Sequence, residues 1–318
     1  MLRADRIGSA YALRVQLEWL RTLVAVVETG SFTRAAAELG LSQPTVSQQM
    51  AALEREAALP LFEPVGRRRL PTEAALLLVE RARVALASLE DAGRTLEELR
   101  GLGRGTLRVG ASTTPGVYMV PQWLGEFASR FPGVEVHLDI ADTRDIEDAL
   151  IRRRVDVAVV GEYDAGAELV ATTLGSDVLL PICAPGEEHM PTLDSFLQQR
   201  FIAREEGSST REIFERWLRD RGRRLRPAME VASTEAVKQV VAAGLGVSVV
   251  SDATIKLELK AGVLASPPTD GFPIKRRIDV VLQRGRRPMP TTVAFLEILL
   301  GPQPAASMAR TASGTATR

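Results

Sequence analysis

The sequence of 318 residues has little of several things that whole classes of function require. It holds a single cysteine, Cys183, which excludes an internal disulfide and any cysteine-based metal cluster. It has no apolar run as long as a membrane span, because its longest one, over 240–250, is interrupted by Gly244 and Gly246. It also has no net charge, since 40 acidic side chains balance 40 basic ones. No excess charge therefore points to a nucleic-acid or membrane partner.

The zero net charge still does not exclude DNA binding. The contribution of phosphate contacts depends on local counterion release rather than on the charge of the whole chain. The basic residues are almost all arginine, which suits forked contacts with phosphates and guanine edges, although a GC-rich coding bias explains that preference equally well. Hydrophobic residues at 45% and charged residues at 25% are ordinary for a soluble globular protein of two or three domains.

The motifs of common enzymes are missing as well. His137 and His189 have no motif around them, and the chain lacks a Walker loop, an HExxH motif and a nucleophile elbow. We therefore expect no catalytic residues, no metal and no cofactor. Residues 1–16 have no apolar stretch typical of a secretion signal, so we expect a flexible extension on a cytoplasmic protein. Cys183 is interpreted as a buried apolar residue, with a redox-sensing role left open.

Residues 17–71 have the pattern of a small helical domain that ends in a hairpin. Apolar periodicity predicts three helices, with Gly30 ending the first and Ser42 capping the third. Pro60 and Pro64 bracket a predicted break before the hairpin tip. The predicted elements are helices over 17–29, 33–39 and 42–57 and a hairpin tip with flanking strands over 65–71.

The third of these helices has a polar N-terminal end. Val46, Met50 and Leu53, spaced four and three apart, give it an apolar face on the other side. A recognition helix presents its N-terminal residues to base edges in the major groove in this way. Two short helices with a polar face occur in many proteins, however, and an arginine triplet is usually a solvated turn. The candidate DNA-contacting residues are Gln43, Pro44, Thr45, Ser47 and Gln48 on the helix and Arg67, Arg68 and Arg69 at the hairpin tip.

A long helix is predicted over 72–100, followed by a hinge that completes a linker segment over 72–104. At about 1.5 Å per residue this helix is roughly 40 Å long. Its apolar positions alternate spacings of four and three, as in the seam of a coiled coil, which favours a dimer. The alternative is a helix that packs on its own domain. The seam positions are Leu78, Ala82, Ala85, Leu89, Ala92, Leu96 and Leu99.

From 105 to 301 strands alternate with helices, which is typical of parallel βαβ units in an α/β domain. Three loops, over 111–116, 206–211 and 231–234, follow a strand and open a helix. Their hydroxyls and free N–H groups favour an anion, and ligands of open α/β sheets bind at this end of the strands. Serine and threonine are also common caps in any fold. The tail over 302–318 is rich in Pro, Ala, Ser and Thr and is expected to be disordered.

The ordered motif GSFTRAAAELGLSQPTVSQQMAALE, followed by LF and RRRLPTEA, closely resembles the N-terminal domain of the LysR-type transcriptional regulators. The resemblance continues to about residue 300. It implies a bacterial winged helix-turn-helix domain over 17–71 in which Gln43, Pro44, Ser47 and Gln48 contact bases. Departures from the family pattern occur at Leu23, Pro64 and Ala75. Pro64 stands where the family has an arginine, so the neighbouring arginines are expected to replace that phosphate contact. The backbone contacts implied by the resemblance come from Thr45, Arg34 and the arginines at 67–69.

The resemblance also implies an effector-binding domain over 105–301, with the two-lobed α/β fold of periplasmic binding proteins of type 2. Lobe I is expected over 105–173 and 271–301, and lobe II over 174–270. Arg211 is a candidate partner for a carboxylate, phosphate or sulfate, or else a surface helix residue. The expected effector-binding residues are Ser112, Thr113, Thr114, Thr143, Ser208, Ser209, Thr210 and Arg211.

The resemblance implies a regulator that binds double-stranded promoter DNA. A small effector is expected to change the binding or bending of that DNA, and the three hydroxyl-rich loops indicate that the effector is an anion. The family precedent implies self-association as a dimer and a tetramer, with RNA polymerase as a further partner and no membrane. The alternative is a solute-binding protein or an enzyme with an accessory helical domain. The ordered match over 30–73 argues against it. The sequence identifies neither the effector nor the target genes.

Overall fold

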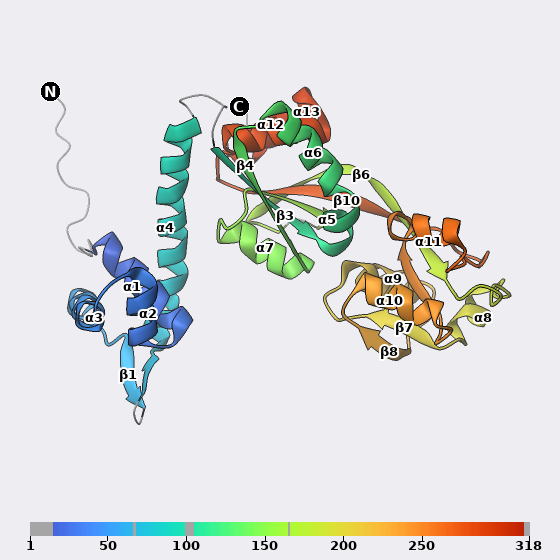
Figure 1. Ribbon diagram of the computed structural model, residues 1–318, viewed down its shortest axis with the longest axis horizontal. Coiled ribbons are helices and arrows are strands. Elements are labelled where there is room, and N and C mark those ends of the chain that lie inside the picture. Colours follow the sequence, from blue (N-terminus) through green and yellow to red (C-terminus); the bar gives the residue numbers. More distant parts are fainter. Residues whose placement is uncertain (1–14, 66–67, 99–104, 165, 315–318) are drawn as a thin grey trace. The chain divides into compact units, whose positions relative to one another are not determined.

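The computed structural model describes residues 15–65, 68–98, 105–164 and 166–314 (Figure 1). The expected extension over 1–16 lies almost entirely outside the described residues, as does most of the hinge. The contacts divide the chain into two compact units, Met1–Gly93 and Arg94–Arg318, and each is treated by itself below. In the described ranges no helix is both long enough and apolar enough to cross a bilayer.

The first unit is a helix-turn-helix followed by a hairpin and a long helix. Leu23, Val46 and Leu53 are completely buried and hold the three short helices together. The three predicted short helices are confirmed, with the second beginning one residue earlier than expected. The elements are α1 Leu17–Thr29, α2 Phe32–Leu39, α3 Gln43–Ala57, β1 Phe62–Val65, β2 Arg68–Pro71 and α4 Glu73–Glu98.

Local chemistry explains where the short helices begin and end. Gly30 and Gly40 take left-handed φ values of 63° and 66° and end α1 and α2, because glycine has no Cβ to oppose that conformation. The Ser42 hydroxyl accepts the Thr45 N–H at 3.2 Å, as predicted for the cap of α3. The turn between α2 and α3 is therefore fixed at both of its ends.

A carboxylate on α3 holds the backbone at the start of the hairpin. Glu54 accepts the backbone N–H groups of Leu61 and Phe62 at 2.9 and 3.1 Å. The predicted break at Pro64 is wrong, because this residue lies inside β1 opposite Arg69. A two-stranded sheet has only edge strands, so a residue without an N–H is tolerated there.

The apolar seam of α4 divides into two parts. Leu78 is half-buried against the core of the first unit and Ala82 is only 2% exposed, so the packed-helix alternative describes this end. Further along, Ala85 and Ala92 are exposed and Leu89 is 48% exposed. The side chain of Leu96 and the whole of Leu99 lie outside the described part of the chain.

The second unit is built on a mixed sheet of six strands in the order β4-β3-β5-β10-β6-β9, with a separate pair β7-β8. The prediction of parallel units holds for β3 with β4 and β5 and for β7 with β8. It is wrong for the other pairs, which are antiparallel. The strands are β3 Gly105–Ser112, β4 Val134–Ala141, β5 Val157–Gly161, β6 Leu169–Ile182, β7 Phe201–Arg204, β8 Pro227–Val231, β9 Ser248–Ser251 and β10 Ile274–Gln283.

The antiparallel pairing follows from the path of the chain. In Figure 1, β6 leads from the region of β3 and β4 to that of β7 and β8, and β10 returns beside it. Two strands that cross in opposite directions between the same two bodies must pair antiparallel. Buried side chains form separate clusters on the two sides of this crossing, which makes the unit two-lobed, as expected.

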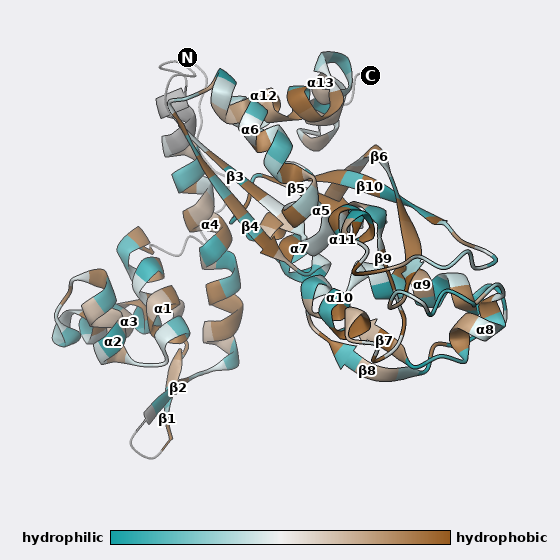
Figure 2. Ribbon diagram, turned by 45° about the vertical axis from the view of Figure 1, so that its right-hand side comes forward, coloured by the Kyte–Doolittle hydropathy of each residue, from teal (hydrophilic) through white to brown (hydrophobic). Residues whose placement is uncertain are grey.

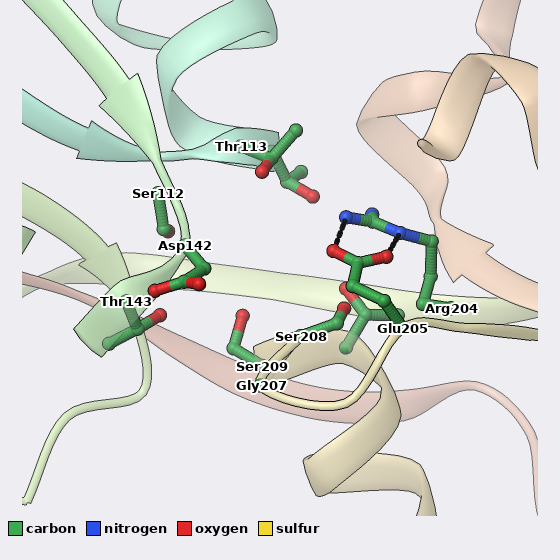
Figure 3. A pocket seen from close by; sticks show the side chains of 11 residues that line it. Ser112, Thr113, Asp142, Thr143, Arg204, Glu205, Gly207, Ser208 and Ser209 are labelled. Carbon is green, nitrogen blue, oxygen red and sulfur yellow. Dashed lines mark hydrogen bonds and ion pairs between the residues drawn. The ribbon is translucent and has the colours of Figure 1, made fainter. Parts of the chain in front are cut away.

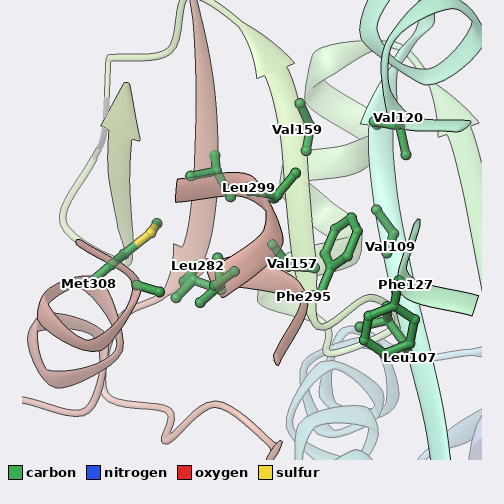
Figure 4. Packing of buried hydrophobic residues seen from close by; sticks show 14 of the residues in the cluster. Leu107, Val109, Val120, Phe127, Val157, Val159, Leu282, Phe295, Leu299 and Met308 are labelled. Atoms are coloured by element: carbon green, nitrogen blue, oxygen red, sulfur yellow. The ribbon is translucent and has the colours of Figure 1, made fainter. Parts of the chain in front are cut away.

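The first lobe packs helices on a buried sheet. The strand β5, coloured as hydrophobic in Figure 2, is buried along its whole length. Phe127 and Phe295 meet edge to face at 5.8 Å between ring centroids in the cluster drawn in Figure 4. The helices of this lobe are α5 Thr113–Tyr118, α6 Val120–Arg130, α7 Thr143–Ile151, α12 Pro290–Leu300 and α13 Pro302–Ala312.

The second lobe has a core of stacked and tilted aromatic rings around Phe214. Cys183 is buried beside this core, as interpreted from the sequence. Burial, with the nearby Glu188 and Glu187, raises the pKa of its thiol to about 11, so little reactive thiolate forms at neutral pH. The helices of this lobe are α8 Leu193–Leu197, α9 Ser209–Arg219, α10 Thr234–Ala242 and α11 Lys256–Ala261, with a 3₁₀ turn at Asp252–Thr254.

The expectation of a disordered tail over 302–318 is wrong for its first part. Residues Pro302–Ala312 form α13, which begins with a proline whose fixed φ suits the first helical turn. Ala305, Met308 and Ala312, spaced three and four apart, are buried in the core of the first lobe. The overall composition of the tail did not reveal this spacing, because the apolar residues in it are few. Residues 315–318 lie outside the described ranges.

The docking of α13 can be tested by shortening one buried side chain. Met308→Ala should lower the free energy of unfolding by about 2–5 kcal/mol, because it leaves a cavity between α13 and the sheet. Urea denaturation of the full chain measures this loss. Ser307→Ala, at an exposed neighbouring position, is the control and should change little. Equal stability of the two variants would show that α13 does not dock.

Candidate functional sites

The first candidate site is the outward face of α3. Val46 and Met50 fill the inward face, at 0% and 1% exposure. The Gln43 side-chain amide donates to the Ser47 hydroxyl at 2.9 Å, so two of the predicted base-reading groups lie next to each other in the open. The residues of the outward face are Gln43, Pro44 and Gln48, which are exposed, and Thr45 and Ser47, which are half-buried.

Two of the predicted arginines flank this helix-turn-helix. The exposed Arg34 guanidinium donates to the Thr29 carbonyl, which holds it at the start of α2. The Arg69 guanidinium lies over the Phe32 ring at 5.4 Å from its centroid, which ties β2 to α2. Arg67 and the side chain of Arg68 lie outside the described residues.

The second candidate site is a small, partly open cleft between the two lobes of the second unit (Figure 3). It lies beyond the carboxyl ends of β3, β4 and β7, where ligands of open α/β sheets bind. Seven of the eight predicted effector-binding residues line it. The lining residues are Ser112, Thr113, Thr114, Asp142, Thr143, Arg204, Glu205, Gly207, Ser208, Ser209 and Thr210.

Hydroxyl groups dominate the walls, and some have no partner. The Thr143 hydroxyl oxygen is buried and makes no hydrogen bond within the described ranges. Ser208 is 6% exposed and does not cap α9 with its side chain. Asp142, by contrast, already accepts the Asp145 N–H at 2.8 Å as the cap of α7. The lining residues therefore include an unpartnered hydroxyl at the start of α7, on Thr143, and another at the start of α9, on Ser208.

A glycine allows the lobes to approach closely here. The Gly161 N–H, at the end of β5, donates to the Ser112 hydroxyl at 3.2 Å. A Cβ on Gly161 would lie 3.3 Å from the Ser209 hydroxyl and 3.6 Å from the Arg276 guanidinium. Any side chain at this position would crowd the first turn of α9.

The charged pair in the cleft, Arg204 and Glu205, was not predicted from the sequence. Arg204 is 5% exposed, and two of its nitrogens donate to the two Glu205 carboxylate oxygens at 2.7 Å each, while a third donates to Thr234 (Figure 3). Burial raises the pKa of Glu205, but the Arg204 hydrogen bonds and charge outweigh it, and the pKa is lowered overall. The sequence feature that indicates this pair is an arginine at the end of an apolar strand, directly before the predicted loop over 206–211.

Arg211, the eighth predicted effector-binding residue, does not line the cleft. Its guanidinium pairs with Glu215 at 2.8 Å and with Glu230 at 2.7 Å, and it donates to the Arg204 carbonyl at 2.9 Å. It braces α9 and β8 against β7. The predicted loop over 231–234 does not line the cleft either, although Thr234 bonds to Arg204.

A buried ion pair next to the cleft holds the helix α9 in position. Arg276 on β10 pairs with Asp177 on β6 at 2.6 and 2.8 Å, and it donates to the Thr210 hydroxyl on α9 at 3.1 Å. Both side chains are almost inaccessible, at 0% and 5% exposure. Burial lowers the pKa of Arg276, although Asp177 opposes the shift. The pair thus links both crossing strands to the helix that carries Ser209 and Thr210.

Polar contacts also join the lobes at the edges. Tyr118 on α5 donates to Glu235 on α10, and the buried Lys238 ammonium lies 3.3 Å from the Tyr118 hydroxyl. Burial, followed by the Glu235 hydrogen bond, raises the pKa of Tyr118 to about 12. Elsewhere Arg216 on α9 pairs with Glu162, which follows β5. Among the described residues, no cluster of His, Cys, Asp or Glu is arranged to hold a metal ion.

Comparison with known proteins gives a consistent result. Two family descriptions match: "Bacterial regulatory helix-turn-helix protein, lysR family" over 17–76 and "LysR substrate binding domain" over 100–301. A RuBisCO operon transcriptional regulator of Allochromatium vinosum is 37% identical over 91% of this chain and 96% of its own length.

Two solved structures are similar in fold. Full-length CbnR complexed with its target DNA has a TM-score of 0.69 at 21% identity, over 89% of this chain and 98% of that one. The regulatory domain of Synechocystis PCC6803 CcmR in complex with 2-PG has a TM-score of 0.57 at 30% identity. It covers 65% of this chain and 97% of its own.

The role of the buried ion pair below the cleft can be tested by removing its negative charge. Asp177→Asn should lower the free energy of unfolding by about 3–5 kcal/mol, because it leaves the Arg276 charge buried and uncompensated. Chemical denaturation measures the change. Asp164→Asn, at the 85% exposed partner of Arg277, is the matched control and should lose at most about 1 kcal/mol. A loss no larger than that of the control would contradict this role.

Proposed function

The chain belongs to the LysR family of bacterial transcriptional regulators, and from this premise we propose that it reads promoter DNA with α3 and senses an anion in its cleft. The proposal rests on one observation, which is that the two units present different kinds of surface. One presents an uncovered polar helix face, and the other encloses a hydroxyl-lined cleft between lobes. We propose that the protein regulates transcription and is not an enzyme.

The DNA-binding part of the proposal rests on what α3 leaves exposed. Gln43 and Gln48 project from the N-terminal half of the helix, where a recognition helix meets base edges. A glutamine amide can pair with both hydrogen-bonding groups of adenine. Arg34 and Arg69 would contact the sugar-phosphate backbone on either side. CbnR, which is similar in fold, has been solved with its target DNA.

The effector part of the proposal rests on the chemistry of the cleft. Free hydroxyls, the start of α9 and the Arg204 guanidinium suit an oxyanion such as a carboxylate or phosphate. The CcmR regulatory domain, 30% identical, was solved with 2-PG. A ligand that bridges the lobes shifts their equilibrium only as far as it binds one arrangement better. That shift would alter promoter binding or bending and the recruitment of RNA polymerase.

Self-association completes the proposed assembly. The exposed part of the α4 seam, around Ala85, Leu89 and Ala92, is available for a second copy of the same helix. Paired helices would align two α3 helices on a two-fold DNA site, and two such dimers would form a tetramer. We place the protein in the cytoplasm, where the promoter DNA of a bacterium is accessible to it.

The base-reading role of α3 can be tested at Gln43. Gln43→Ala should cost about 1–3 kcal/mol in binding to the cognate promoter fragment and relax the preference at one base position. Gel shifts at fixed salt with the cognate fragment and its single-base variants measure this. Gln122→Ala, an exposed glutamine in the second unit, is the control. If Gln43→Ala weakens binding equally on all fragments, Gln43 contacts no base.

The effector role can be tested by thermal unfolding of the full chain with and without 2-PG and other small organic anions. A ligand at a hundredfold excess over its Kd adds about 2.7 kcal/mol of stability and should also shift promoter binding in gel assays. Arg204→Met should abolish the shift, while Arg219→Met, 62% exposed on α9, should keep it. Promoter binding that responds to no anion would contradict the proposal.

A further inference from the structure

The positive end of the cleft is already filled by a side chain of the protein. Arg204 is the only arginine or lysine among the described residues that line the cleft, and Glu205 engages it through two hydrogen bonds of 2.7 Å. Asp142 adds a second negative charge. The cleft therefore carries one net negative charge as it stands, which does not suit the oxyanion that its hydroxyls favour.

The geometry of this pair is that of a bound ligand. Two parallel N–H···O bonds join the guanidinium edge to both carboxylate oxygens, which is how arginine holds a free carboxylate or phosphate. The remaining guanidinium nitrogen bonds to Thr234, so Glu205 occupies the edge that faces the cleft. Three of the five guanidinium N–H groups are therefore engaged, and the edge formed by Nε and Nη2 is fully used by Glu205.

From this arrangement we propose that Glu205 is a built-in competitor, whose carboxylate occupies the seat on Arg204 that the effector's anionic group takes. The inference rests on the proposed anionic effector and names how its site is regulated. The Glu205 side chain is 26% exposed, so it can leave toward solvent without crossing the core. Its release exposes the guanidinium and removes one negative charge from the cleft.

The need to displace Glu205 from Arg204 lowers the apparent affinity for the effector and selects among anions. The apparent affinity of the effector is reduced by the fraction of molecules in which the seat is free. A tethered carboxylate also competes at high effective concentration, so a monocarboxylate gains little by replacing it. A phosphate carries more charge and more acceptor oxygens, which suits a cleft whose lining residues include several with hydroxyl groups, among them Thr143 and Ser208. The competitor thus favours a phosphate group over a single carboxylate.

The displacement of Glu205 also affects α9, the helix that contacts the first lobe. Glu205 begins the short loop into α9, and Gly207 in that loop has a φ of 89°. The same helix pairs with the first lobe through Arg216 and Glu162, and its Thr210 bonds to the buried Arg276. Movement of Glu205 therefore begins next to the contacts that hold the lobes together.

The test removes the competing charge and leaves its neighbour as a control. Phosphate binding to the full chain is measured by titration calorimetry, with acetate as the monocarboxylate probe. Glu205→Gln should bind inorganic phosphate at least tenfold more tightly than the unmodified protein. Glu206→Gln removes the same charge one residue away, at an exposed position outside the cleft, and should stay within twofold. Acetate affinity should rise in Glu205→Gln as well, since the seat is then open.

A second pair of variants ties the effect to Arg204. In an Arg204→Met background, Glu205→Gln should give no gain in phosphate affinity, because the seat itself is missing. Glu205→Ser is measured alongside, so that the result does not depend on how one variant folds. Unchanged or weaker phosphate binding in both Glu205 variants would overturn the inference. If promoter binding still responds to an organic anion, that outcome leaves the proposed function intact; if it responds to none, the proposed function fails as well.

Discussion

The second unit depends on one buried ion pair at the crossing of its lobes. Arg276 and Asp177 face each other on β10 and β6, the two strands that connect the lobes, and neither is open to water. Taking two charges out of water costs several kcal/mol each, and only close geometry with additional hydrogen bonds offsets that cost. The extra hydrogen bond goes to Thr210 on α9. A pair that would be expensive anywhere else therefore fixes the position of the helix that lines the cleft.

The position of α9 determines which side chains line the cleft. With α9 held against the crossing strands, Ser208 and Ser209 face Ser112 and Thr143 of the other lobe (Figure 3). Gly161 provides the space, since a Cβ there would come within 3.3 Å of the Ser209 hydroxyl. The site is thus rich in hydroxyls yet poor in free positive charge. Selection among ligands depends on whether a ligand can replace Glu205 as well as on how many hydrogen bonds it makes.

Several parts of this picture follow from the sequence because they depend on local rules. Ser42 caps α3, and the spacing of Val46 and Met50 orients its polar face outward. The hydroxyl loops also lie where loops after parallel strands must lie. Arg204 was missed because its role depends on burial against elements distant in sequence. The sequence does not reveal that Arg211 lies outside the cleft, because Glu230, which pairs with it, is nineteen residues away. The helix over 302–312 was not predicted because its three buried apolar residues form a pattern only when they pack against the first lobe.

The contacts between the lobes explain how a small ligand can have a structural effect. The lobes touch through Tyr118 with Glu235 and through Arg216 with Glu162, and most of these side chains are partly open to water. Such contacts contribute little individually, because water competes for the same groups. The covalent crossing by β6 and β10 is permanent, whereas the edge contacts can break. A ligand that bonds to hydroxyls of both lobes therefore adds to a weak set of contacts, and even a modest differential affinity changes their balance.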